Sequence, residues 1–171
     1  MTRTVLLQRC YPYPPEILWR ALTDATLLGR WFMQNDIVPE KGHEFTFRMA
    51  PQKGWDGITH CEITELDPLQ TIAYTYRGKV SGEKPLACAG INSGIADSAA
   101  KGIFAELDNV LSFTLTPTGG STNLTMEHSG FKGVNLIIVS LIMGMGMGWK
   151  KQLNKKLPPV LRAIAAEHNK R

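Results

Sequence analysis

Residues 4–32, with the sequence TVLLQRCYPYPPEILWRALTDATLLGRWF, decide the fold because they place a strand directly before two short helices. The strand-forming run ends after Tyr11, where closely spaced prolines supply no N–H groups for a sheet. Pro15 suits the first turn of a helix, where an N–H group is not needed. A second short helix, capped by Thr23 or Asp24, completes the segment.

Beyond this segment the apolar residues alternate with polar ones, which is typical of strands that bury one face. Turn residues such as Asp67-Pro68 and Gly119-Gly120 separate these runs. We therefore expect five further antiparallel strands, at residues 43–49, 55–66, 70–77, 110–116 and 122–128.

The last third is predicted to be a long C-terminal helix that begins at about residue 136. It is apolar nearly all round up to Trp149 and amphipathic afterwards, so it needs extensive burial. Pro158-Pro159 should break or kink it.

Residues 79–109 do not fit the alternating pattern, and we interpret them as an insertion in a single domain that spans residues 1–171. The first half of the insertion is rich in Gly, Ala and Ser. Four apolar residues at four-residue spacing suggest an amphipathic helix that faces inward over a cavity mouth. They are Ile95, Ala99, Ile103 and Leu107.

Composition excludes several classes of protein. The formal charge of +4 comes from 19 Lys and Arg against 15 Asp and Glu, and without the motifs of nucleic-acid modules we expect no nucleic-acid partner. Cys10, Cys61 and Cys88 are an odd, widely spaced set with no secretory leader before them, which indicates a cytoplasmic protein. The glycine-interrupted run 134–149 is short for a transmembrane segment. The histidines and cysteines lack the spacing of metal ligands, so we expect no metal and no cofactor.

The order of strand, two short helices, antiparallel strands and long helix resembles the SRPBCC superfamily, also called START-like or birch-pollen-allergen-like. Local signatures are similar to the branch named after activators of the ninety-kilodalton heat-shock chaperone. They lie at residues 14–32, 57–68, 72–76 and 122–131 and at Gly148-Trp149. The resemblance implies an α+β helix-grip fold, in which a curved antiparallel sheet wraps around the long C-terminal helix.

The resemblance also implies an internal cavity for a hydrophobic small molecule, such as a lipid or a polyketide. We expect a continuous apolar cavity of ~300–1,000 Å³ between helix and sheet. Its predicted lining comprises Phe45, Phe47, Trp55, Tyr74, Tyr76, Phe113, Leu115, Leu124, Met126, His128, Met143 and Met147.

Several of these residues have alternative interpretations. His128 would orient a ligand hydroxyl or carbonyl at the cavity mouth, or it would be a structural histidine tied to the backbone. Tyr74 and Tyr76 would fix a ligand or be ordinary core tyrosines. His60 and Glu62 share one strand face and could move protons, but Cys61 and Ile63 offer an equally good buried face. Glycine-methionine repeats at 143–148 would provide adaptable cavity walls or a close helix contact.

Three functions therefore remain open. The first is binding of an apolar small molecule, which requires no catalytic residues. The second is a cyclase, dehydratase or hydrolase in which His128 and Tyr76 move protons. The third is a protein-interaction module similar to the chaperone activators; these carry an additional N-terminal domain not found in the 171 residues, which weighs against direct chaperone stimulation. Neither the ligand nor the oligomeric state follows from the sequence.

Overall fold

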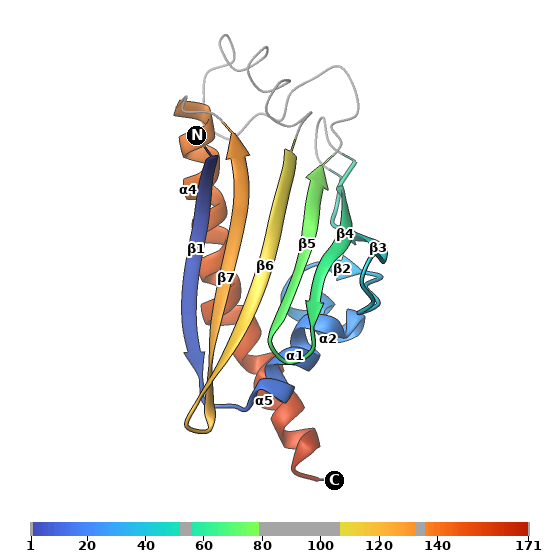
Figure 1. Ribbon diagram of the computed structural model, residues 1–171, viewed down its shortest axis with the longest axis vertical. Helices are drawn as coiled ribbons and strands as arrows, with labels where there is room; N and C mark the ends of the chain where they lie inside the picture. Colours follow the sequence, from blue (N-terminus) through green and yellow to red (C-terminus); the bar gives the residue numbers. More distant parts are fainter. Residues whose placement is uncertain (1, 52–55, 79–106, 133–135, 171) are drawn as a thin grey trace.

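The computed structural model describes residues 2–51, 56–78, 107–132 and 136–170, with residues 107 and 136–142 described by their backbone alone. One strand, two short helices, a run of strands and a C-terminal helical segment follow one another, the order expected for this α+β protein (Figure 1). The elements are β1 (Thr2–Tyr11), α1 (Pro15–Thr23), α2 (Ala25–Trp31), β2 (Gln34–Asn35), β3 (Glu44–Arg48), β4 (Ile58–Asp67), β5 (Thr71–Gly78), β6 (Leu107–Thr118), β7 (Ser121–Lys132), α4 (Leu136–Lys151), η1 (Gln152–Lys156) and α5 (Leu157–His168).

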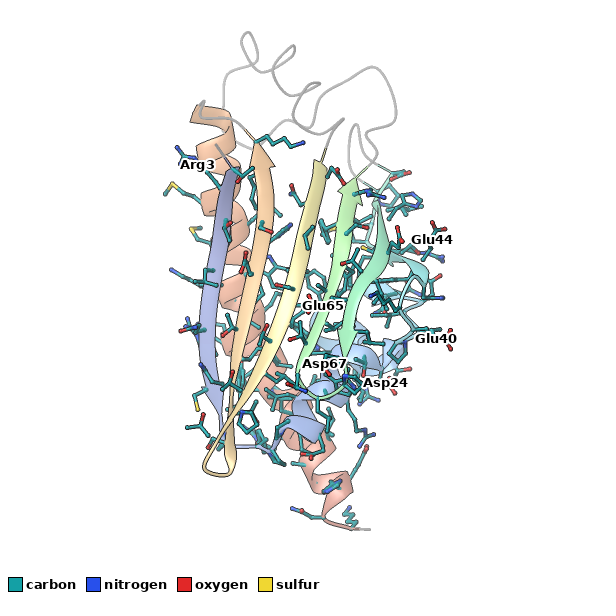
Figure 2. The ribbon with its side chains drawn as sticks, viewed as in Figure 1. Arg3, Asp24, Glu40, Glu44, Glu65 and Asp67 are labelled. Atoms are coloured by element: carbon teal, nitrogen blue, oxygen red, sulfur yellow. The ribbon has the colours of Figure 1, made fainter. Side chains whose placement is uncertain are left out.

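The described strands form one antiparallel sheet in the order β1-β7-β6-β5-β4-β3-β2. The first strand pairs with the last, from Thr2 opposite Lys132 to Tyr11 opposite Thr122. Figure 1 shows the long helical segment α4-η1-α5 lying across one face of this sheet, with α1 and α2 near the end where α5 lies. This arrangement confirms the helix-grip fold. Figure 2 gives two reference points, with Arg3 at one end of the sheet and Asp67 at the other.

Local signals position the two short helices as the sequence predicts. Pro15 is the first residue of α1, and Asp24 caps α2 because its Oδ1 accepts a hydrogen bond from the Leu27 N–H at 3.0 Å. The indole N–H of Trp31 donates to the Ala21 carbonyl at 2.9 Å, which fastens α2 to α1. Trp31 is fully buried, so the two helices form one side of the core.

The core lies between the helical segment and the inner face of the sheet. Alternate residues of the strands point inward, as the period-two pattern predicts. The helical segment contributes four buried residues to the same core: Trp149, Leu153, Leu157 and Leu161. The inner-face side chains from the sheet include Phe45, Phe47, Ile63, Ile72, Tyr74, Leu111, Phe113, Leu115, Leu124 and Met126.

Several bounds differ from the prediction, and one strand was not predicted. β6 begins at Leu107, two residues before the predicted end of the insertion, because Leu107 to Asn109 pair with Gly78 to Tyr76 of β5. The short strand β2 was not predicted, since two residues carry no periodic signal. The remainder of the insertion, including Ile95, Ala99 and Ile103, lies outside the described residues, as does the Leu107 side chain.

Pro158 and Pro159 do not break the C-terminal helix. Instead α4 continues through five residues of π-helix, η1, into α5. The Leu157 N–H donates to the Gln152 carbonyl, which is the wide turn of a π-helix. Pro158 and Pro159, which have no N–H groups to donate, then lie in the first turn of α5. Among the described residues, no helix is both long and apolar enough to cross a membrane.

Candidate functional site

A hollow lies between the inner face of the sheet and the junction of α4 with η1. Its volume is about 160 Å³, close to the ~150 Å³ of an engineered apolar cavity that holds one benzene molecule. We call it the Trp149 hollow. It is lined by Phe32, Tyr76, His128, Met145, Gly148, Trp149 and Gln152.

Of the continuous cavity of ~300–1,000 Å³ that we expected, the described residues show this hollow of about 160 Å³ between helix and sheet, with aromatic side chains packed behind it. Trp149 stacks on Phe32 with ring centroids 4.6 Å apart and meets the Phe113 ring edge-on at 5.9 Å. Phe45 packs against Tyr74 at 5.2 Å. These contacts border the hollow, whose volume is that of one ring-sized group.

His128 contributes a polar side chain to the hollow and is fully buried. The Trp149 indole N–H donates to its Nδ1 at 3.3 Å, so Nδ1 carries no proton. Burial lowers the pKa of His128 to about 4, and the imidazole is therefore neutral near pH 7. The single proton of a neutral imidazole must then be on Nε2, which has no hydrogen-bond partner among the described residues.

A bulge in β7 follows this histidine and brings Phe131 to the same face. Between the pairs Val5–His128 and Arg3–Phe131 the strand β7 has one more residue than β1. Gly130 takes up the distortion with a φ of +96°, and a Cβ there would lie 3.1 Å from the Asp108 carbonyl oxygen. As a result both His128 and Phe131 face inward, with ring centroids 4.9 Å apart.

Tyr76 stands beside His128 on the neighbouring part of the inner face. Their rings meet edge to face at 5.1 Å. Burial raises the pKa of Tyr76 to about 12, although a hydrogen bond with Thr59 opposes this shift. The phenol of Tyr76 is therefore neutral, and it contributes mainly an aromatic wall.

Gln152 enters the hollow from the first residue of the π-helix. Its side-chain Oε1 is buried without a partner among the described residues. The π-helix is held from β1, because the Tyr11 hydroxyl donates to the Leu153 carbonyl at 2.6 Å. Such wide turns are frequent at functional sites because they redirect side chains.

The structure brings only part of the predicted lining into this hollow. Tyr76 and His128 line it, whereas the other inner-face residues form the packed core behind it. These are Phe45, Phe47, Tyr74, Phe113, Leu115, Leu124 and Met126. Trp55 lies outside the described residues.

The orientation that we expected for Met143 and Met147 is wrong, because their side chains are 64% and 68% exposed. The helix turns Met145 and Trp149 inward instead, in one four-residue series with Leu153 and Leu157. Sequence reasoning also missed Phe32, Trp149 and Gln152 as lining residues. Counting back from Leu157 in steps of four, from the amphipathic end of the helix, would have identified Trp149 and Met145.

The pair His60 and Glu62 lies on the outer face of the sheet, with Cys61 buried on the other side. A larger, polar hollow of about 410 Å³ surrounds the pair. The charge of Arg77, which lines this hollow, is paired. Its Nε–H donates to Asp108 at 2.8 Å and lowers the pKa of that carboxyl. This face is solvated, and within the described part of the chain no group of His, Cys, Asp and Glu side chains is arranged to hold a metal ion.

Comparisons with known proteins agree with this architecture. The solved structure of protein MLL2253 from Mesorhizobium loti is similar with 34% identity and a TM-score of 0.68, over 94% of this chain and 98% of that one. CalU16 from Micromonospora echinospora has 17% identity and a TM-score of 0.61, over 97% of this chain and 83% of that one. The Aha1 dimer from Colwellia psychrerythraea has 16% identity and a TM-score of 0.60, over 88% of this chain and 90% of that one.

No curated protein sequence matches this chain. The family model described as "Activator of Hsp90 ATPase homolog 1-like protein" matches residues 12–161. The match confirms the resemblance to the SRPBCC superfamily that the strand and helix signatures indicated. The chain belongs to the family of Activator of Hsp90 ATPase homolog 1-like proteins.

Proposed function

We propose that this protein binds a small apolar molecule and that a ring-sized part of the molecule occupies the Trp149 hollow. The observation that carries the proposal is the composition of the wall. Phe32, Tyr76 and Trp149 offer aromatic faces and edges to a guest, and Met145 adds a flexible thioether. Ligand sites are typically concave, largely apolar and provided with a few polar groups, and this hollow has that character.

The residues behind the wall support the same function. Phe113 packs on Trp149, and Phe47 packs against both Phe32 and Tyr76, with centroid distances of 4.9 and 6.3 Å for the last two. These contacts fix the lining rings from behind. A guest therefore meets a preorganised wall, which reduces the ordering cost of binding. Of the predicted classes of ligand, a ring-containing molecule such as a polyketide fits this volume better than a long acyl chain.

Binding is better supported than catalysis. His128 and Tyr76 are the two titratable residues among the hollow's lining, and their pKa values of about 4 and about 12 lie far from neutrality. A general acid or base works best with a pKa near the working pH. In the cyclase, dehydratase or hydrolase alternative, the ligand itself would have to supply the acid or the base that these two residues do not provide near pH 7.

Family membership keeps an activator-like contact with a chaperone as a further alternative. A pull-down from native cytoplasm with the chain as bait would test that alternative, with capture of a heat-shock ATPase as the supporting result. The cytoplasmic location itself remains a prediction from the sequence.

The binding proposal is tested by filling the hollow. Met145→Trp places an indole into a space of about 160 Å³, whereas Met147→Trp makes the same substitution at an exposed position one half-turn away. Titration with toluene, followed by amide chemical shifts in NMR, should show binding to the parent and to Met147→Trp. The Met145→Trp variant should bind at least tenfold more weakly.

Two results would contradict the proposal. One is equal toluene affinity in both tryptophan variants, which would place the guest elsewhere. The other is failure of the parent to bind toluene and also the larger apolar dye N-phenylnaphthylamine. Circular dichroism of both variants verifies that each is folded before the titration.

A further inference from the structure

Two polar atoms of the Trp149 hollow have no partner among the described residues, and they come from opposite walls. One is Nε2 of His128, on the sheet, and the other is Oε1 of Gln152, on the π-helix. Buried polar groups in folded proteins are nearly always hydrogen-bonded, so an unpaired pair in one hollow points to a group that binds there.

The hydrogen-bonding role of each atom is fixed by its surroundings. His128 receives the Trp149 N–H on Nδ1, and therefore its Nε2 carries the hydrogen and is a donor. The Gln152 oxygen is an acceptor. Both residues line the same small hollow, so a guest that occupies it lies against both side chains.

Among the described residues, the lining contains no charged side chain that would compensate an ion. Its members are aromatic residues, a methionine, a glycine, a glutamine and the neutral histidine. A carboxylate or an ammonium group that left water for this hollow would find no counter-charge among the described lining residues, which is unfavourable. The complementary guest is therefore neutral, and it both accepts and donates one hydrogen bond.

We propose that the Trp149 hollow recognises a hydroxyl group on a flat ring, a phenol, whose oxygen accepts the His128 Nε2–H and donates its own hydrogen to Gln152 Oε1. This inference rests on the proposed function and names the chemistry of the ligand. A hydroxyl suits the site because one oxygen atom fills both roles. The ring stacks between the Phe32, Tyr76 and Trp149 walls.

The test compares three ring compounds of similar size. Phenol makes both bonds, anisole accepts from His128 without donating to Gln152, and toluene makes neither. Each net hydrogen bond changes affinity by about 2- to 13-fold. Affinity for the parent protein should fall from phenol to anisole to toluene, with each step in this range.

Gln152→Met keeps the length of the side chain and removes its oxygen, so the preference for phenol over anisole should disappear. Met147→Leu, at an exposed position of the same helix, should retain that preference. The ¹⁵N resonance of His128 Nε2 gives a second readout that does not depend on a variant. It should shift with phenol and anisole and stay in place with toluene.

The outcomes separate this inference from the function on which it rests. If toluene binds as tightly as phenol, if Gln152→Met keeps the parent's preference, or if Nε2 does not respond to phenol, the phenol inference is wrong and apolar binding stands. If none of the three compounds binds and N-phenylnaphthylamine also fails, both are wrong.

Discussion

The change Tyr11→Phe tests what holds the π-helix in place. Within η1 the Leu157 N–H donates to the Gln152 carbonyl, so it is not the donor for the Leu153 carbonyl. The residue five places after Leu153 is Pro158, which has no N–H. The Tyr11 hydroxyl supplies the missing donor at 2.6 Å, from the other end of the sequence. Phenylalanine keeps the ring and removes only this hydroxyl.

The magnitude follows from burial. Leu153 and Tyr11 are both buried, so water does not replace the lost donor. Leaving a buried carbonyl unpaired costs about 1–3 kcal/mol, and we expect the free energy of unfolding to fall by about that amount in urea denaturation. Tyr13→Phe is the matched control, because the Tyr13 hydroxyl has no hydrogen bond to the described residues; it should stay within about 0.5 kcal/mol of the parent.

A loss no larger than that of the control would refute the reasoning. It would mean that the Leu153 carbonyl finds another donor in solution and that the π-helix does not depend on β1. If Tyr11→Phe also weakens the preference for phenol over anisole, then the Tyr11 hydrogen bond helps to position Gln152, which lies in η1.

Two further predictions concern the neighbourhood of His128. Gly130→Ala should destabilise the protein by more than about 1 kcal/mol and by more than Gly119→Ala, since both glycines have positive φ but only Gly130 meets the Asp108 backbone; equal losses in thermal unfolding would argue against a tight bulge. On folding, burial lowers the pKa of His128 from 6.5 to about 4. Between these values the unfolded chain binds more protons than the folded protein, so the free energy of unfolding drops as the pH falls from about 6.5 to 4, by up to about 3 kcal/mol. His128→Phe should lose that part of the pH dependence, and an unchanged slope in urea titrations would contradict it.

The fold could be predicted from the sequence because its signals are local. A proline-terminated strand, an Asp24 cap and alternating strands each depend on a few neighbouring residues. Their order then leaves few topologies, and the resemblance to a known superfamily selects one of them. The pairing of β1 with β7 over the whole length of both strands is the long-range consequence.

The hollow was predicted only in part, because the rotation of the helix about its axis is set by tertiary contacts. The glycine-methionine repeat drew attention to Met143 and Met147, which are exposed. The indole of Trp149 decides the rotation instead, through its packing on Phe32 and Phe113. A repeat of small and flexible residues identifies no face by itself, whereas a four-residue series of large apolar residues does.

The sequence left two interpretations of His128, a ligand-orienting group and a structural histidine. Each of its two ring nitrogens bears on one of them. Strand alternation correctly placed His128 inward, since the count of two from Leu124 holds up to the bulge at Gly130. It could not predict the partner, which is the Trp149 indole from the helix and not the backbone. Because that bond occupies Nδ1 alone, the structural interpretation accounts for one nitrogen only. Nε2 has no hydrogen-bond partner among the described residues, so the ligand interpretation depends on this atom, and the response of its resonance to phenol decides between the two interpretations.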